Sequence, residues 1–187
     1  MSIFGKKKQD QKEGIEKQIR DAIKGKSGLE ERFNRDVEWY QGRRTYFMDL
    51  EDFKYIETKN YDLLVVRMES RSSHGGGGIS WASIIDLYMT DKSVGKTRKI
   101  GLMYLPKRDG FDSKKDITEL FGSRRIDVKL ADDHLLEVSV LDNKGNPIEK
   151  VPDPDYCWAP GMIQHHPDEY IRTIVQVDLL KKNYSER

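Results

Sequence analysis

Alternating apolar and polar positions mark the middle of the chain. Residues 61–69 form a short run rich in branched apolar side chains, and residues 79–90 carry apolar side chains at every second position. Residues 98–105 follow a polar turn that contains Gly95. A period of two with β-branched and aromatic residues is typical of strands in a half-buried sheet. We therefore expect the chain to be organised around two strands that feed a hairpin.

The same period predicts strands before and after this group. Residues 45–57 alternate at first and change phase after Leu50, which predicts one strand with a bulge or two short pieces. Turn signals, strongest at residues 143–146, separate the later apolar runs. The later predicted strands comprise residues 124–130, 135–142, 147–151 and 170–180.

A helical period precedes the first strand. Residues 28–41 place an apolar side chain at every third or fourth position, which predicts a helix that caps the sheet. Ser27 and Glu30 match a capping box at its start, and Gly42 is a natural stop. One further short helix is expected near residues 114–121.

The first 26 residues are rich in charge and carry one narrow apolar stripe at helical spacing. The stripe comprises Ile15, Ile19 and Ile23. A short helix is marginal alone in water, so we expect a basic, marginally helical extension whose stripe lies against a partner. Three lysines beside an apolar pair suggest contact with an anionic surface, and a solvated tail is the alternative interpretation. These lysines are Lys6, Lys7 and Lys8.

Helices followed by seven or eight strands, most of them joined by turns, predict a mainly β, α+β fold. We expect an antiparallel, sandwich-like sheet domain with N-terminal helices. The βαβ alternation of a parallel nucleotide-binding sheet is missing from the pattern. The expected parts are an extension over 1–26, a single domain over 27–180 and a charged tail over 181–187.

Composition and charge narrow the function only a little. The net charge is +1 although 35% of the residues are charged, so the chain as a whole has no bias towards nucleic acid or anionic membranes. The single cysteine, Cys157, excludes an internal disulfide and a cysteine-rich zinc site. Without a signal segment or an apolar run of roughly 20 residues, we expect a cytoplasmic protein or one inside a bacterial or phage particle.

A run of four glycines is the first candidate for chemistry. Gly75, Gly76, Gly77 and Gly78 follow His74, and consecutive backbone N–H groups can approach a phosphate closely. However, no Lys-Ser or Lys-Thr pair follows, and a strand rather than a helix comes next, so a Walker loop and a dinucleotide motif are not predicted. A loop that simply links two strands is the plainer interpretation.

Two histidines and the cysteine are weaker candidates. His165 and His166 are adjacent, and adjacent side chains on a strand point to opposite faces, which makes a poor metal site. Cys157 lies between Tyr156 and Trp158 and resembles a packed apolar residue rather than an activated thiolate. We therefore expect no catalytic residue, no metal and no cofactor.

Aromatic and basic residues alternate where the predicted helix meets the first strand. Trp39, Tyr40, Arg43, Arg44 and Tyr46 could stack on bases while the arginines hold phosphates. Acidic residues follow directly and would repel a nucleic-acid backbone. Aromatic residues that fill the rim of the core are the favoured interpretation.

These observations predict a non-catalytic interaction or structural subunit of a larger bacterial or phage assembly, which binds a protein partner or itself. Rigid aromatic residues in loops are favoured interface anchors, which adds Trp158, with His165 and His166 nearby, to the expected surface. One alternative is a phosphate- or nucleotide-binding enzyme that uses the glycine-rich loop 74–78. The other is a peripheral binder of nucleic acid or membrane surfaces that uses the N-terminal lysines.

Overall fold

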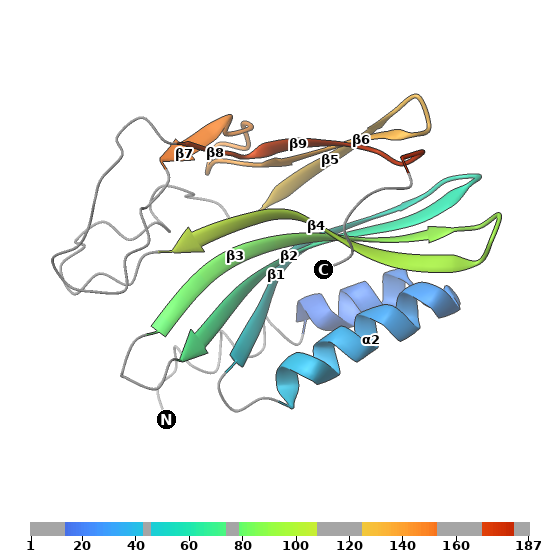
Figure 1. Ribbon diagram of the computed structural model, residues 1–187, viewed down its shortest axis with the longest axis horizontal. Helices are drawn as coiled ribbons and strands as arrows, with labels where there is room; N and C mark the ends of the chain where they lie inside the picture. The colour runs from blue at the N-terminus through green and yellow to red at the C-terminus, as the bar shows by residue number, and fades with distance from the viewer. Residues whose placement is uncertain (1–13, 43–45, 74–78, 108–124, 153–169, 182–187) are drawn as a thin grey trace, which may run out of the picture.

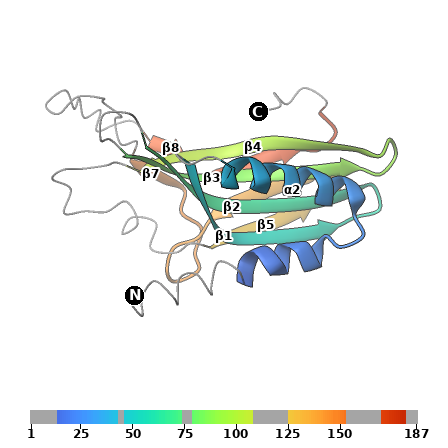
Figure 2. The ribbon, with the colours of Figure 1, turned by 90° about the horizontal axis from the view of Figure 1, so that it is seen from below.

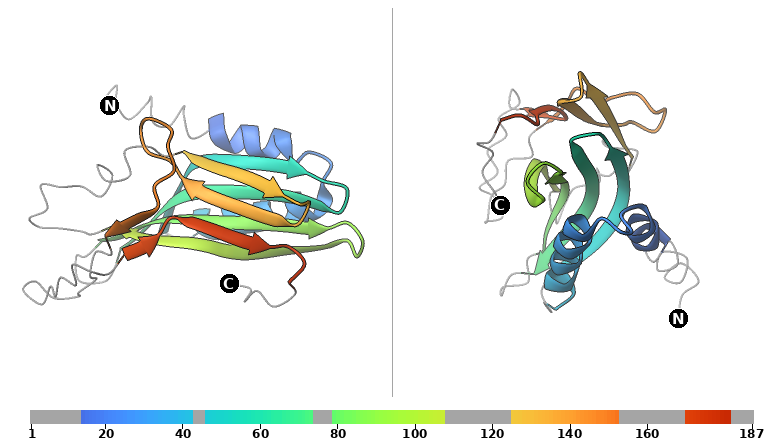
Figure 3. Two further views of the ribbon diagram at one scale, coloured as in Figure 1. Left: turned by 90° about the horizontal axis from the view of Figure 1, so that it is seen from above. Right: turned by 90° about the vertical axis from the view of Figure 1, so that its right-hand side faces the viewer.

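The computed structural model describes residues 14–42, 46–73, 79–107, 125–152 and 170–181, which form three stacked layers (Figure 1). Two helices make the first layer, a four-stranded sheet the second and a three-stranded sheet the third. Viewed end-on, the four-stranded sheet lies between the helices and the smaller sheet (Figure 3). All strand pairs in both sheets are antiparallel, which confirms the predicted fold class.

The four-stranded sheet is a meander with the order β1-β2-β3-β4. Its strands are β1 Tyr46–Glu57, β2 Tyr61–Ser73, β3 Ile79–Asp91 and β4 Lys96–Lys107. The register of β1 on β2 shifts between Leu50 and Asp52, which confirms the predicted bulge. In the β3–β4 turn Gly95 has a φ of 64°, a left-handed conformation that glycine adopts without strain.

The three-stranded sheet has the order β5-β6-β9. Its strands are β5 Ile126–Ala131, β6 Leu135–Val140 and β9 Ile174–Asp178. The predicted strand over 170–180 is split, because Thr173 donates its backbone N–H to Glu149 O (3.2 Å) instead of continuing one ladder. The part before Thr173 is β8 Tyr170–Arg172, which pairs with β7 Lys150–Pro152 in a separate two-stranded ladder.

The two sheets pack face to face through the odd-numbered side chains of β2 and β3. These apolar side chains meet the inner face of the smaller sheet in one buried cluster. The cluster includes Leu63, Val65, Ile85, Leu87, Met89, Leu136, Val138, Val140 and Val177. The outer face of the smaller sheet carries polar pairs such as Glu137 and Gln176 (3.0 Å), as expected for an antiparallel sheet with one solvated face.

The even-numbered side chains of the same two strands face the helices. Helix α2, Ser27–Gln41, covers them with the buried face that its sequence predicted. The helix-side cluster includes Leu29, Phe33, Val37, Leu64, Val66, Met68 and Tyr88. Because both faces of β2 are covered, residues 61–69 are buried without interruption.

The start of α2 differs from the prediction. Lys26 is the N-cap residue, and the Ser27 side chain makes no capping hydrogen bond, so the predicted capping box is wrong. Glu30 Oε1 instead accepts a hydrogen bond from Gly25 N (3.0 Å), which satisfies a donor in the preceding turn. Gly42 ends the helix as predicted.

A second helix, over residues 14–22, lies beside α2 on the same face of the sheet (Figure 2). Ile19 and Ile23 are fully buried in the helix-side cluster, and Ile15 packs against it. The described part of the predicted N-terminal extension therefore shares one core with α2. The helices before and after residue 26 therefore pack into the same buried cluster.

Some predictions lie outside the described residues. They include the short helix near 114–121 and the tail after residue 181. Within the described ranges, no helix combines the length and apolar character needed to cross a membrane.

Candidate functional site

Most residues that the sequence singled out as sites lie outside the described ranges, and their roles stay predictions. They comprise Lys6, Lys7, Lys8, His74, Gly75, Gly76, Gly77, Gly78, Trp158, His165 and His166.

The predicted partner-binding stripe of Ile15, Ile19 and Ile23 requires a correction. These side chains pack against the chain's own sheet, so they are not a free surface for another protein. Arg20, between them, fixes the helix in place, because its guanidinium bonds to Glu16 and also to Asn34 of α2. Both helices pack on the same face of the four-stranded sheet, and this face covers the isoleucine stripe of the helix over residues 14–22.

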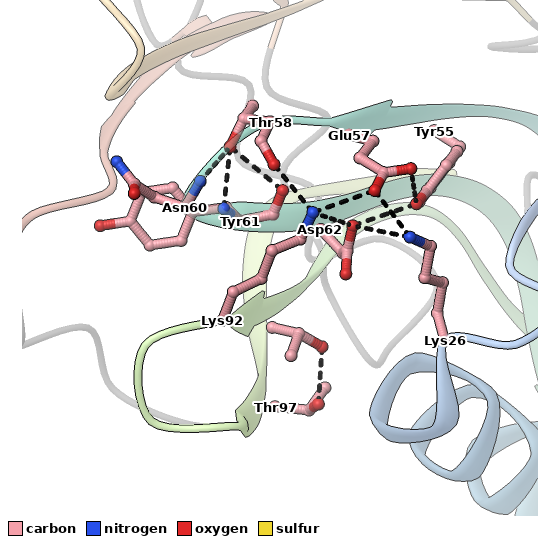
Figure 4. Close-up of polar contacts among 10 residues, drawn as sticks. Lys26, Tyr55, Glu57, Thr58, Asn60, Tyr61, Asp62, Lys92 and Thr97 are labelled. Atoms are coloured by element: carbon pink, nitrogen blue, oxygen red, sulfur yellow. Dashed lines mark hydrogen bonds and ion pairs between the residues drawn. The ribbon is translucent and has the colours of Figure 1, made fainter.

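A network of lysines and carboxylates joins the connection between the helices to the ends of the β-hairpins (Figure 4). Glu57 Oε1 lies 2.7 Å from Lys26 Nζ and 3.1 Å from Lys92 Nζ. Asp62 Oδ1 lies 3.1 Å from Lys92 Nζ and 3.6 Å from Lys26 Nζ. The Tyr55 hydroxyl donates a hydrogen bond to Asp62 Oδ1 (3.1 Å).

The protonation of this network favours a structural role. The hydrogen bond from Lys26 is the main cause that lowers the pKa of Glu57 to about 2, and the same bond raises the pKa of Lys26. Desolvation opposes the charge on Lys92, but hydrogen bonds to Glu57 and Asp62 raise its pKa overall. Glu57 and both lysines therefore keep their charges near neutral pH, whereas a proton-transfer group needs a pKa near the working pH.

A second ionic network lies between α2 and the four-stranded sheet. Lys99 of β4, 11% exposed, places Nζ 2.8 Å from Asp36 Oδ2 and 3.0 Å from Asp86 Oδ2. The Tyr88 hydroxyl donates to Asp36 Oδ2 (3.0 Å). Burial lowers the pKa of Lys99, but Asp86 and Asp36 more than offset this effect and raise it. This network ties the middle of α2 to β3 and β4.

A third polar cluster lies between the sheets, beyond the apolar core. The Arg67 side chain is 2% exposed and donates from Nε to Ser83 Oγ (3.0 Å), with Glu51 Oε2 at 3.6 Å. At the neighbouring edge, Asp52 Oδ2 accepts a hydrogen bond from Ile126 N (2.8 Å) and so fixes the start of β5 on β1. Across the described ranges, no group of three or more His, Cys, Asp or Glu side chains is arranged to hold a metal ion.

Two large aromatic side chains remain half-exposed on the helix side of the four-stranded sheet. Trp39, near the end of α2, is 46% exposed, and Tyr104 of β4 is 50% exposed. The indole of Trp39 makes an edge-to-face contact with Tyr40, with 4.9 Å between the ring centroids. Val94 and Leu180 are also exposed, but each lies in or beside a turn.

Helix α2 begins near the β3–β4 turn and packs on β1, β3 and β4. Gly28, near its start, lies so close to Thr97 that a Cβ would overlap the threonine Oγ1. Asp36, two turns later, contacts Lys99, which is further along β4. The direction of the helix follows from these two contacts.

Trp39 and Tyr104 both lie on the helix side of the four-stranded sheet, Trp39 on α2 and Tyr104 on β4. Arg32, Asp36 and Trp39 are spaced by four and three residues, so they form one row on α2, and Asp36 places that row over β4. Tyr104 is opposite Ile84 in the register of β4 on β3, and Ile84 packs against the helix-side cluster. We call Trp39 and Tyr104 the aromatic flank.

The interpretation that the aromatic residues at this junction fill the rim of the core is confirmed for Tyr40, which packs against the helix-side cluster, but is wrong for Trp39, which is 46% exposed. In the predicted helix, Leu29, Phe33 and Val37 define the buried face, and Trp39 falls away from it. The position of Tyr104 could not be predicted, because the pairing of β4 with β3 shifts by one residue between Gly101 and Met103. After such a shift, alternate side chains of β4 point to the opposite faces of the sheet.

Comparison with known proteins gives no further assignment, since no family model, curated protein or solved structure matches the chain.

Proposed function

We propose that this protein is a non-catalytic interaction subunit of a larger assembly, and that the aromatic flank is the surface that binds a protein partner. The observation that carries this proposal is the half-exposure of Trp39 and Tyr104 on the helix side of the four-stranded sheet, where the other large apolar side chains are mostly buried. Tryptophan and tyrosine are enriched at the energetic centres of protein interfaces.

The exposed area is large enough to matter for binding. Covering the exposed half of one such aromatic side chain removes roughly 100 Å² of mostly apolar surface and contributes roughly 2–3 kcal/mol. Two of them contribute roughly 5 kcal/mol, while association costs at least about 4 kcal/mol in lost freedom of motion. The aromatic flank is therefore expected to act as an anchor within a wider contact.

The two networks of lysines and carboxylates support the same proposal. Lys99 pairs with Asp36 and so connects β4 to α2. Glu57 pairs with Lys26 and Lys92 and so connects β1 to the turn between the helices and to the β3–β4 turn. Their role as links between helices and strands accounts for these charges without a substrate.

The test is site-directed photo-crosslinking of the full-length chain in the cells that produce it. A photoreactive phenylalanine analogue is placed at position 39 or 104, and at position 129 as a matched control, because Lys129 is exposed on the opposite face of the molecule. We expect protein adducts from positions 39 and 104 but not from 129. Equal adducts from all three positions, or none from 39 and 104, would contradict the proposal.

A further inference from the structure

A row of alternating charges lies beside the aromatic flank on α2. Glu31, Arg35 and Glu38 are exposed and are spaced by four and three residues, so they share one face of the helix. Arg35 is also four residues before Trp39 and is therefore its neighbour along the surface. The row reads negative, positive, negative in the direction of the chain.

Two members of this row, Arg35 and Glu38, are self-complementary under two-fold symmetry. Consider two antiparallel α2 helices whose two-fold axis passes between residues 36 and 37. Arg35 of each copy then faces Glu38 of the other, so one pair of positions supplies two ion pairs across the interface. The same register places Trp39 of one copy within one turn of Arg35 of the other, where a guanidinium can lie over the indole face.

We infer that the protein partner at the aromatic flank is a second copy of this chain, docked through antiparallel α2 helices. The inference rests on the proposed function and names its partner. A net charge of only +1 means that two copies do not repel each other as whole molecules.

The neighbouring edge of the sheet favours side-chain docking over strand pairing. β4 is an edge strand, and its sequence includes Pro106 and, near its two ends, the lysines Lys96 and Lys107. Its register also shifts opposite Ile85 and Asp86. Proline, lysine and a bulge are the features by which edge strands resist adding another strand. The second copy is therefore expected on the helix rather than along β4.

Charge reversal in the purified full-length chain tests this arrangement. Arg35→Glu and Glu38→Arg each place like charges across the two-fold axis, so each variant alone should raise the dimer dissociation constant at least about tenfold in sedimentation equilibrium. An equimolar mixture of the two variants makes both contacts complementary again and should restore dimers with nearly the wild-type constant. Lys129→Glu, on the opposite face, is the matched control and should leave the constant unchanged.

The mixture separates contacts between copies from contacts within one helix. An Arg35–Glu38 interaction inside α2 would be broken in both variants and would not be restored by mixing. Unchanged dimers in the single variants, or no recovery in the mixture, would overturn the inference. If the purified chain stays monomeric while position 39 crosslinks to a different protein, the inference fails and the proposed function stands. If neither association is found, both fail.

Discussion

Lys99 lies beneath α2 with two carboxylate partners, and its surroundings decide what its removal would do. Asp36 and Asp86 are largely buried and approach its ammonium group within 2.8 and 3.0 Å. Removing one partner of a buried ion pair leaves the other charge without compensation. The side chain is thus expected to matter far more than a lysine on the surface.

Lys99→Met should lower the free energy of unfolding by about 3 kcal/mol, the lower end of the usual range for buried pairs, because some solvent reaches the site. For a chain of this size the Tm should fall by about 6–12 °C. The matched control is Lys129→Met, which removes an exposed lysine 3.1 Å from Asp127 and should change stability by less than about 1 kcal/mol. Equal effects of the two substitutions in urea unfolding would refute the structural role.

The same network predicts a loss of stability at alkaline pH. The carboxylates raise the pKa of Lys99 in the folded state, and burial raises the pKa of Tyr88 well above its ordinary value. Both groups therefore hold their protons more tightly when folded, and their contribution is complete below about pH 10 and is lost as the pH rises further. The urea midpoint should fall between pH 9 and pH 11, and the fall should be smaller in Lys99→Met. The same fall in both proteins would exclude Lys99 as a cause.

Gly28 is a second residue whose role depends on close packing. Alanine usually stabilises a helix relative to glycine by about 1 kcal/mol. At this position, however, a Cβ would overlap Thr97 Oγ1, so Gly28→Ala should destabilise the protein by about 1–3 kcal/mol. The double variant Gly28→Ala, Thr97→Ala should recover part of the loss in thermal unfolding. A stabilised single variant would show that α2 does not lie this close to β4.

At the scale of elements, the helix over residues 14–22 is part of the core. Ile19 is fully buried against the four-stranded sheet, so Ile19→Ala should cost about 2–4 kcal/mol through lost apolar contact and a cavity. Gln18→Ala, on the exposed face of the same helix, is the matched control and should change stability by less than about 0.5 kcal/mol. A negligible effect of Ile19→Ala on the urea midpoint would support a separate, dispensable extension instead.

Most elements could be predicted because their periods are local. The period of two located the strands, the three- to four-residue period located α2, and the phase change after Leu50 located the bulge. The split at Thr173 could not be predicted, because it depends on a hydrogen bond to Glu149, which is distant in sequence. The packing of the helix over residues 14–22 was missed for a similar reason, since its three isoleucines predict a buried face but not the sheet that buries it.

At the scale of the whole molecule, the central sheet is buried on both faces. The uninterrupted burial of residues 61–69 follows from this arrangement, because one face of β2 meets the helices and the other meets the smaller sheet. The sequence predicted a sandwich-like domain but not the order of the three layers, which depends on contacts between distant segments. The candidate surface could not be predicted either, because the exposure of Tyr104 depends on the shifted register of β4.

We expect the aromatic flank of the folded chain to associate with protein, and specifically with a second copy of the chain. The most direct measurement is the mass of the purified full-length chain by light scattering over a range of concentrations, beside Trp39→Ser. We predict that the wild-type mass rises from 21.8 kDa towards twice that value, and that Trp39→Ser needs at least about tenfold higher concentration for the same rise. A wild-type mass of 21.8 kDa at every concentration, or identical curves for both proteins, would contradict self-association through this surface.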